Sequence, residues 1–175
     1  DGLVLADAVV FLTLESEDHV HRRGGRALAE IIGYGSNCGA EHLTAPDLAS
    51  EVAAMRAALD DAGISRDAVD LVVVHGTATR RNDVVEGHAL REVYGDDGAF
   101  PALTAVKSMM GHAMGASGAI GAAAAVFALS SNTVPPTINL DTPDPACAIA
   151  GFSPVASPRS LRHAMVNAFA FGGHN

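Results

Sequence analysis

The sequence is poor in cysteine, and the cysteines it has are not spaced for a metal site or a disulfide framework. Cys38 and Cys147 are the only two in 175 residues, and they lie far apart without a CxxC pair. Structural zinc sites and disulfide scaffolds need closely spaced pairs or larger sets. We therefore expect no metal site and no disulfide, and we place the chain in a reducing, cytoplasmic compartment.

Basic residues are also scarce. The chain has 11 lysines and arginines against 20 acidic residues, a formal net charge of -9. A nucleic-acid binder needs a basic surface that displaces the counterions of phosphates, so we exclude that class. The nearest basic groups are Arg22, Arg23 and Arg26 near the start and Arg80 and Arg81 in the middle. We interpret both groups as ordinary solvated surface and keep the docking of an acidic partner as the less favoured alternative.

No long hydrophobic run is present. The longest small and apolar stretch, residues 113–129, is shorter than the roughly 20 residues that span a bilayer, so we predict a core helix and no membrane partner. The first residues resemble a folded strand and no signal peptide, although the chain opens on Asp1-Gly2 without a methionine. We expect one domain over residues 1–175, truncated at both ends.

The apolar residues, 49% of the chain, are arranged as alternating strands and helices. Leu71 to Val74 form a continuous β-branched run, which is typical of a strand buried on both faces. Helix signals follow such runs repeatedly, and this alternation predicts an α/β domain. The expected helices are 48–62, 83–94 and 113–130; the expected strands are 3–14 and 26–34, paired as a hairpin, then 71–74, 102–106, 148–153 and 163–169.

The first polar cluster follows the buried strand. His75 comes directly after it, where side chains of α/β sheets enter the ligand crevice. Gly76 permits close backbone approach, and the hydroxyls of Thr77 and Thr79 can donate and accept hydrogen bonds. A single histidine in this position is more often a solvated loop residue, and threonine is common in turns.

The second cluster contains Lys107 after a strand and His112 just before a helix. The positive end of the helix dipole disfavours a protonated histidine, so we expect His112 to be neutral and able to donate to an oxyanion. If Lys107 lies at the sheet edge it needs a carboxylate partner, for which we name Glu86. The alternative is an ordinary surface lysine.

The third cluster is the terminal segment NAFAFGGHN. Phe169 and Phe171 alternate onto one face, and the bend at Gly172-Gly173 has backbone N–H groups that could point at a reacting carbonyl. A Gly-Gly turn after a strand is otherwise unremarkable. None of the three clusters identifies a function alone.

Taken together, HGTATRRND, KSMMGHAMGASGA, VPPTINLD and NAFAFGGHN resemble, in order and spacing, the signature blocks of the β-ketoacyl-acyl-carrier-protein synthases. The resemblance covers nearly the whole chain and corresponds to the C-terminal half of these thiolase-like proteins. It implies a layered α/β fold with a mixed central sheet and covering helices, one half of a duplicated αβαβα core.

The resemblance also implies roles for residues. In this family a malonyl thioester loses carbon dioxide, and two neutral histidines stabilise the charge that develops on the thioester oxygen. His75 and His112 match that pair, and Lys107 matches the lysine that orders the site. Thr77 and Thr79 match the threonines that bind the pantetheine arm, and Phe171 resembles the gating phenylalanine and oxyanion N–H donor. We add Phe169 and Gly172 as substrate-binding residues and Asp83 and Glu86 as structural support.

The implied reaction is a decarboxylative Claisen condensation in fatty-acid or polyketide synthesis. No permanently bound cofactor is implied, because the phosphopantetheine arm of an acyl carrier protein delivers the substrate. Further implied partners are the N-terminal half of the ketosynthase, which supplies the nucleophilic cysteine, and a second subunit in a homodimer or a ketosynthase heterodimer. Cys38 and Cys147 do not match the nucleophile's motif, and Ala78 and Ala170 replace residues that are often glycine or serine in the family.

Two other hypotheses remain open from the sequence. The first is a non-catalytic partner similar to a chain-length factor, although such partners typically lose the histidine motifs that this chain retains. The second is a degradative thiolase, which shares the fold, but the two-histidine pattern argues against it.

Overall fold

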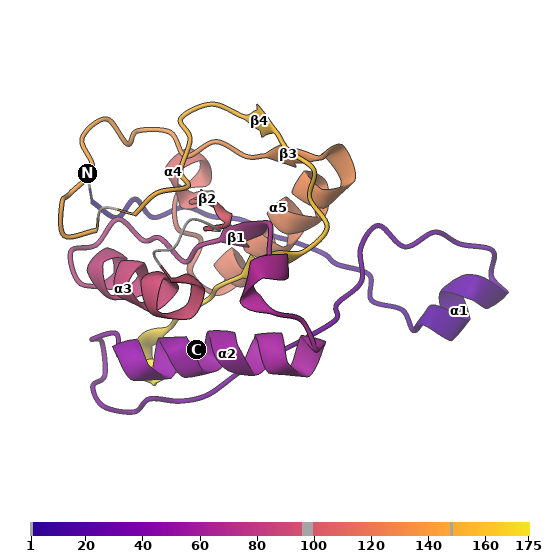
Figure 1. Cartoon of the computed structure of the whole chain (residues 1–175), viewed down its shortest axis with the longest axis horizontal. Helices are drawn as coiled ribbons and strands as arrows, with labels where there is room; N and C mark the ends of the chain where they lie inside the picture. The colour runs from indigo at the N-terminus through magenta and orange to yellow at the C-terminus, as the bar shows by residue number, and fades with distance from the viewer. Residues whose placement is uncertain (1, 96–99, 148) are drawn as a thin grey trace.

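The computed structural model describes residues 2–95, 100–147 and 149–175. A small parallel sheet forms its centre, in the order β2 (Ala102–Thr104), β1 (Leu71–Val73) and β5 (Ala164–Val166). Helices α2 (Leu48–Ala62) and α3 (Asn82–Tyr94) lie on one side of this sheet, and α5 (Ser117–Ser131) lies on the other (Figure 1). The predicted α/β class is confirmed.

Strand directions are mixed across two sheets within the described residues. Both neighbours of β1 run parallel to it, whereas β3 (Thr133–Val134) and β4 (Ser157–Pro158) form a separate antiparallel pair. We expected one central sheet with both parallel and antiparallel strands. Instead, the central sheet is parallel and the antiparallel pair forms a second sheet. Short elements complete the chain: α1 (Glu17–Arg22), α4 (Lys107–Met110) and the 3₁₀ turns η1 (Arg66–Ala68), η2 (Met114–Ala116) and η3 (Phe171–Gly173).

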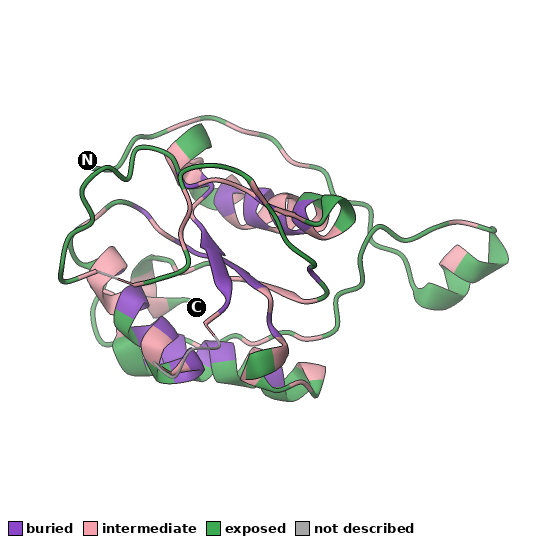
Figure 2. Cartoon of the chain, turned by 45° about the horizontal axis from the view of Figure 1, so that its top comes forward, coloured by how far each residue is buried: buried purple, intermediate pink, exposed green. Residues whose placement is uncertain are grey.

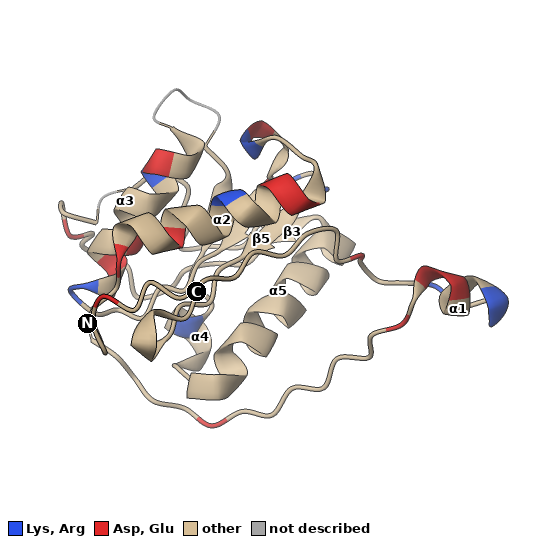
Figure 3. Cartoon of the chain, turned by 90° about the horizontal axis from the view of Figure 1, so that it is seen from below, with Lys and Arg blue, Asp and Glu red and all other residues tan. Residues whose placement is uncertain are grey.

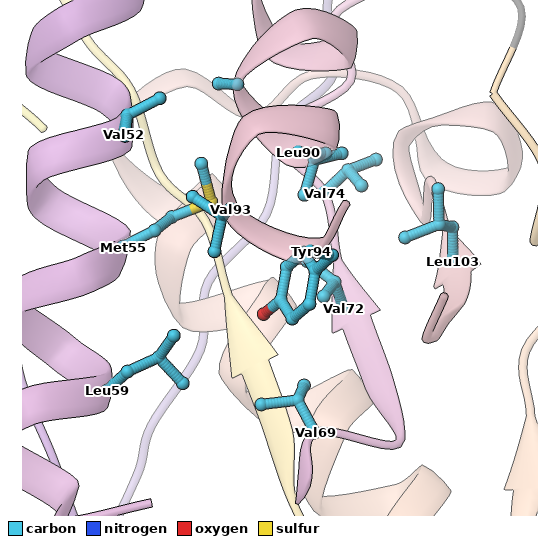
Figure 4. Close-up of a cluster of buried hydrophobic side chains, with 11 residues drawn as sticks. Val52, Met55, Leu59, Val69, Val72, Val74, Leu90, Val93, Tyr94 and Leu103 are labelled. Atoms are coloured by element: carbon cyan, nitrogen blue, oxygen red, sulfur yellow. The ribbon is translucent and has the colours of Figure 1, made fainter. Parts of the chain in front are cut away.

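The core consists of two hydrophobic clusters, one on each face of β1. Val72 and Val74 pack with α2 and α3, around Leu90 and Tyr94 (Figure 4). The alternate strand residues, among them Leu71, pack with α5 in the second cluster. Because successive strand residues point to opposite faces, a continuous apolar run serves both clusters, and β1 is buried throughout (Figure 2).

Local signals place the two helices that carry the first cluster. Asp47 caps α2 by accepting the N–H of Ser50 at 2.8 Å, and Gly63 ends the helix in the left-handed conformation with φ 64°. Both features match the predicted start and stop. Helix α3 begins at Asn82, one residue before the predicted start, and ends at Tyr94 as predicted.

Helix α5 agrees with the predicted core helix on one face only. Ile120, Gly121, Ala125 and Ala128 are buried there, whereas Phe127 is exposed on the other face. The helix carries no charged side chain along its length (Figure 3). By length and composition alone, Met114–Ser131 could also cross a membrane, which is weak evidence because core helices of soluble proteins meet the same test.

The N-terminal segment differs from the prediction. Residues 3–14 and 26–34 form no strand, and the expected hairpin is wrong for the described chain; only Leu5 makes an isolated bridge, with His112. The two stretches are extended and lie before and after α1, which projects from the body (Figures 1 and 3). Strand residues need paired neighbours to satisfy their backbone groups, and these stretches have almost none within residues 2–95 and the other described ranges.

The closing strands are also shorter than predicted. Residues 163–169 contain the three-residue strand β5, and residues 149–153 form no strand, while residue 148 lies outside the described residues. Single backbone hydrogen bonds hold the second stretch instead, from Leu103 N to Gly151 O at 2.9 Å and from Thr137 N to Ser153 O at 2.7 Å. The prolines of the preceding connection supply no N–H groups for a regular ladder.

Candidate functional site

The polar clusters meet at the carboxyl edge of the parallel sheet. His75 follows β1, Lys107 begins α4 after β2, and Asn167 directly follows β5. The ends of parallel strands meet at the same edge of a sheet, where α/β proteins place their ligand crevice. The topology thus brings together residues that are 92 positions apart in the sequence.

His75 is held by its backbone. Its N–H donates to Glu86 Oε1 at 2.7 Å, and its carbonyl accepts a hydrogen bond from Lys107 Nζ. The imidazole is buried, and its Nδ1 has no hydrogen-bond partner among the residues described. Burial lowers the pKa of His75 to about 3, and the charges of Lys107 and His112 contribute. The ring is therefore neutral at physiological pH.

His112 is held by its side chain. Its Nδ1 accepts the backbone N–H of Met114 at 3.0 Å, so in the neutral ring the proton is on Nε2. Ser117 Oγ, at 2.9 Å from the same nitrogen, is placed to donate to it as well. Burial, followed by the charge of Lys107, lowers the pKa of His112. This direction agrees with the predicted neutral ring, but its causes are burial and the lysine charge rather than the expected helix dipole, because α5 begins only at Ser117.

The two imidazoles lie against each other. Their ring centroids are 5.7 Å apart with an interplanar angle of 88°. Phe169 approaches His75 from the C-terminal segment, also with a centroid separation of 5.7 Å. Three segments far apart in the sequence therefore place three rings together, with two neutral N–H donors among them.

Lys107, the sole lysine of the sequence, does not form the predicted ion pair. Among the described residues no carboxylate lies within ion-pair distance of its ammonium, which binds the His75 carbonyl instead. Glu86 acts on it only at longer range, where its charge opposes the lowering of the lysine pKa by burial. The pairing with Glu86 was a wrong prediction because backbone donors already occupy that carboxylate.

Glu86 anchors the strand end. Its two oxygens accept the backbone N–H groups of His75 and of Gly76, the latter at 2.8 Å. The amide of Asn167 donates to it at 3.2 Å, and the amide of Asn82 does so at 3.4 Å. Asn167 and Asn82 were not assigned from the sequence, although each lies within a quoted motif, NAFAFGGHN or HGTATRRND, and an asparagine amide suits a buried carboxylate. Glu86 thus contacts the site through the backbone of His75 and Gly76, and its supporting role stays a prediction.

The loop after His75 is built on hydrogen bonds. The hydroxyls of Thr77 and Thr79 are 2.8 Å apart, so each has a partner before any ligand binds. Burial raises the pKa of Asp83, while the amide of Asn82 and the N–H groups of loop 77–79 oppose that rise. Asp83 thus supports the loop that carries the two threonines.

The alanines that replace usual family residues behave differently. Ala78 has φ 57°, in the left-handed region where a Cβ is strained, so a glycine would fit there more easily. Ala170 has φ -135°, which any residue adopts without strain. Only the first substitution therefore affects the shape of its loop.

The terminal segment is only partly arranged as predicted. Phe169 is half-buried beside His75, whereas Phe171 is 67% exposed. The N–H of Gly172 donates to Leu43 O at 2.7 Å, so it is not free for a reacting carbonyl. The prediction of a free N–H at Gly172 is corrected. Asn175 then ties the end of the chain to the body, with backbone bonds to Asn37 in both directions at 3.1 Å.

A pocket of about 440 Å³ opens beside these residues. Lys107, His112, Thr77 and Asp83 contribute to its polar wall. The remaining wall includes apolar side chains from α3 and from the connection after α5, namely Leu90, Leu140, Ile149 and Phe152. Such a mixed lining suits a molecule with a polar reacting end and an apolar remainder.

Neither cysteine has the surroundings of an activated nucleophile. Cys38 is exposed, and its thiol donates to Gly172 O at 3.2 Å. Cys147 lines the pocket, but burial raises the pKa of its thiol, and the charges of Asp83 and Asp144 raise it further. A reactive cysteine needs the opposite shift, toward the thiolate. No group of three or more possible metal ligands occurs within the described ranges.

Comparison with known proteins gives a consistent result. A family model described as "Beta-ketoacyl synthase, C-terminal domain" matches residues 28–141. "Nodulation protein E" of Rhizobium meliloti is 40% identical over 174 residues, which are 99% of this chain and 43% of that protein. "3-oxoacyl-[acyl-carrier-protein] synthase 2" of Coxiella burnetii is 38% identical over 177 residues, covering 100% of this chain and 43% of that protein.

Solved structures agree with these relatives. The structure titled "The ishigamide ketosynthase/chain length factor" is 42% identical, with a TM-score of 0.88 over 92% of this chain and 40% of that one. A chain from the structure titled "type II PKS acyl-carrier protein in complex with its ketosynthase bound to the hexaketide" is 32% identical. Its TM-score is 0.86 over 91% of this chain and 40% of that one. The chain spans about two fifths of the length of the proteins it matches.

Proposed function

The chain belongs to the β-ketoacyl synthase family, with the thiolase-like fold of the ketosynthases, and from this premise we propose that it supplies the decarboxylation site of a condensing enzyme. The observation that carries the proposal is the pair of neutral imidazoles, His75 and His112, with ring centroids 5.7 Å apart. The proposed substrate is a malonyl group held as a thioester on the phosphopantetheine arm of an acyl carrier protein. No permanently bound cofactor is required.

The proposed step moves one electron pair. The bond between the malonyl α-carbon and its carboxylate breaks, carbon dioxide leaves, and the electron pair is shared between the α-carbon and the thioester oxygen. His112 Nε2–H donates to that oxygen, since its Nδ1 is occupied. For His75 the Nε2–H is the proposed second donor, since Nδ1 is enclosed. Two neutral donors stabilise the charge that develops in the transition state more than they stabilise the bound substrate. This difference lowers the barrier.

Lys107 has two proposed roles. Its ammonium fixes the His75 carbonyl, and its positive charge helps keep both imidazoles unprotonated. A protonated imidazole would still donate, but its second N–H would disturb the Met114 contact that orients His112. We therefore assign Lys107 to ordering the site, with Glu86 and Asp83 supporting the loop that follows His75.

The carrier arm is proposed to lie along the threonine loop. Thr77 and Thr79 offer hydroxyls to the amides of the pantetheine, and the mixed pocket accommodates its apolar stretches. Phe169 packs beside His75, and the exposed ring of Phe171 is proposed to gate the entrance, with Gly172 shaping the turn that presents it. The complex of a ketosynthase with its carrier protein among the similar structures supports this choice of partner.

The cysteine that accepts the acyl group is proposed to lie in the N-terminal half. The surroundings of the two cysteines support this, because the thiol of Cys38 donates to a backbone carbonyl and burial raises the pKa of the Cys147 thiol. A complete enzyme would then join both halves, in a homodimer or in a ketosynthase heterodimer, to make the carbon–carbon bond in fatty-acid or polyketide synthesis. The cytoplasmic location stays a prediction.

A second candidate function is a non-catalytic partner subunit. It is favoured by one observation, that two similar structures are titled as containing a chain length factor. The ordered histidine pair and Lys107 favour the catalytic role, because a non-catalytic partner subunit does not need oriented, neutral hydrogen-bond donors.

Carbon dioxide release from malonyl-carrier protein by the full-length protein tests the proposal. His112→Ala should lower the rate roughly 10²- to 10³-fold, as does the loss of one oxyanion donor elsewhere. His88→Ala is the matched control, since His88 is exposed on α3. An unchanged rate in His112→Ala would remove this residue from the mechanism, and no release by the wild type would favour the partner subunit.

A further inference from the structure

Glu51 is a buried acid that the site described above does not use. It lies in the first turn of α2 and is 0% exposed. Both of its carboxylate oxygens lack a hydrogen-bond partner among the described residues. An ionised carboxylate is rarely left buried in this way, because removing its charge from water without donors is very costly. The side chain therefore needs a physical explanation.

Glu86, across the contact between α2 and α3, gives the comparison. Both glutamates are buried, and the negative charge of Glu86 contributes to raising the pKa of Glu51. Glu86 accepts the backbone N–H groups of His75 and Gly76 and the amide of Asn167. Burial raises the pKa of Glu86, but these donors oppose that rise, and Glu51 has no such donor among the described residues. The charge of the pair thus belongs on Glu86, and the proton belongs on Glu51.

The charges around Glu51 have one sign. Glu86 faces it from α3, and Asp47 faces it from the N-cap of its own helix. Burial is the main cause that raises the pKa of Glu51, to about 8, and these two acids add to it. Among the described residues the cation Lys107 acts on Glu86 and not on Glu51. Nothing nearby therefore compensates an ionised Glu51.

We propose that Glu51 is a positioning residue that must remain a neutral acid for Glu86 to hold the His75 end of the site. When Glu51 loses its proton, a second negative charge enters the region that contains the Glu86 carboxylate. The two buried charges then repel each other, and this repulsion displaces Glu86 from the N–H groups of His75 and Gly76. Glu51 thus sets the alkaline limit of the ordered site, and its effect on activity rests on the proposed decarboxylation.

The sign of the stability effect follows from proton uptake. The folded state keeps a proton on Glu51 up to about pH 8, whereas the unfolded chain releases it near 4.5. Between these values the folded state holds more protons, so Glu51 makes stability fall as the pH rises, and the fall stops above the folded pKa. Replacing Glu51 with a group that does not titrate removes this slope.

The main experiment compares melting temperatures in the full-length protein. The melting temperature of Glu51→Gln should rise relative to that of the wild type as the pH increases from about 5 to about 8. Above about pH 8 the difference between the two should stay level. Asp60→Asn is the matched control, because Asp60 is an exposed carboxylate on the same helix. The proposal would be overturned if the difference in melting temperature between Glu51→Gln and the wild type did not change with pH across this range.

A second variant and an infrared measurement keep the test decisive. Glu51→Met, an unbranched side chain that needs no hydrogen bond, should lose the same slope if the glutamine variant folds poorly. In the wild type, infrared spectra should show a carboxylic-acid band at neutral pH that disappears in alkali, and the absence of that band at neutral pH would contradict a protonated Glu51.

Activity gives a separate outcome. Carbon dioxide release by the wild type should decline above about pH 8, and the decline should move to higher pH in Glu51→Gln. Superimposed profiles would refute the positioning role. If His112→Ala leaves the release unchanged while the melting slope of Glu51→Gln is lost, the decarboxylation proposal fails and the neutral Glu51 stands.

Discussion

Residues 71–73 and residues 9–14 consist of similar side chains with opposite burial. Leu71 is 0% exposed, whereas Phe11 is 92% exposed and Leu14 is 74% exposed. Strand β1 has a parallel neighbour on each edge and a helix layer on each face, whereas residues 9–14 form no strand and only Val10 among them packs against a core cluster (Figure 2). Strand propensity therefore gives a strand only where partners exist. The relatives are more than twice as long, and we interpret the exposed stretch as the surface that the N-terminal half covers.

The largest expected effect is at the anchor of the buried region. Glu86→Ala leaves the N–H groups of His75 and Gly76 and the Asn167 amide without their acceptor. We expect a loss of roughly 3–5 kcal/mol in the free energy of unfolding, measured by denaturant titration. Glu92→Ala removes an exposed carboxylate from the same helix and should cost less than about 1 kcal/mol. Equal losses would show that Glu86 is not an anchor.

The second prediction tests the comparison itself. Leu71→Ala should cost about 2–5 kcal/mol, because it opens a cavity in a closed cluster. In the 175-residue chain, Leu14→Ala should change stability by no more than about 0.5 kcal/mol. In the full-length protein the cost of Leu14→Ala should rise above about 1 kcal/mol if the other half covers it. A small cost in both proteins would mean that the stretch remains exposed.

Acidification should distinguish the site from the exposed segment. The pKa of His75 is lowered from 6.5 to about 3, so the unfolded chain takes up a proton first as the pH falls. Stability should therefore drop between these values, by on the order of 5 kcal/mol from His75. His75→Asn should lack that part of the slope. The matched control is His21→Asn, which makes the same substitution at an exposed histidine. Parallel curves for the wild type and His75→Asn would show that His75 titrates normally.

The smallest expected effect is at the strained loop. Ala78→Gly relieves a Cβ at φ 57° and should stabilise the fold by about 0.5–1 kcal/mol, measured by denaturant titration. Ala170→Gly, at an ordinary φ, should instead destabilise by a similar amount because it only adds freedom to the unfolded chain. The same sign for both changes would contradict the assigned strain.

The sequence predicted the parts of the site that depend on strand order. His75 and Lys107 were placed correctly because parallel strands end at one edge, and helix α2 was placed correctly because Asp47 and Gly63 mark its ends. It did not predict which polar side chains are buried by contacts between distant elements. Glu51 has an ordinary place in an amphipathic helix, and only the packing of α3 against it makes it a buried acid.

The failed predictions have the same physical basis. Lys107 was paired with Glu86 by charge alone, but the backbone N–H groups at the strand end had already taken that carboxylate. The hairpin over residues 3–34 was inferred from propensity, and propensity does not show whether a pairing partner is available in the chain. Both errors arose where long-range contacts decide the outcome.

A double-mutant cycle on carbon dioxide release tests the histidine pair most directly. If His75 and His112 donate to one thioester oxygen, they act as a unit, and the double alanine variant of the full-length protein should be little slower than the slower single variant. The unfolding curves of all three variants serve as the control for folding. Effects that multiply in the double variant would show independent roles and would contradict a shared oxyanion site.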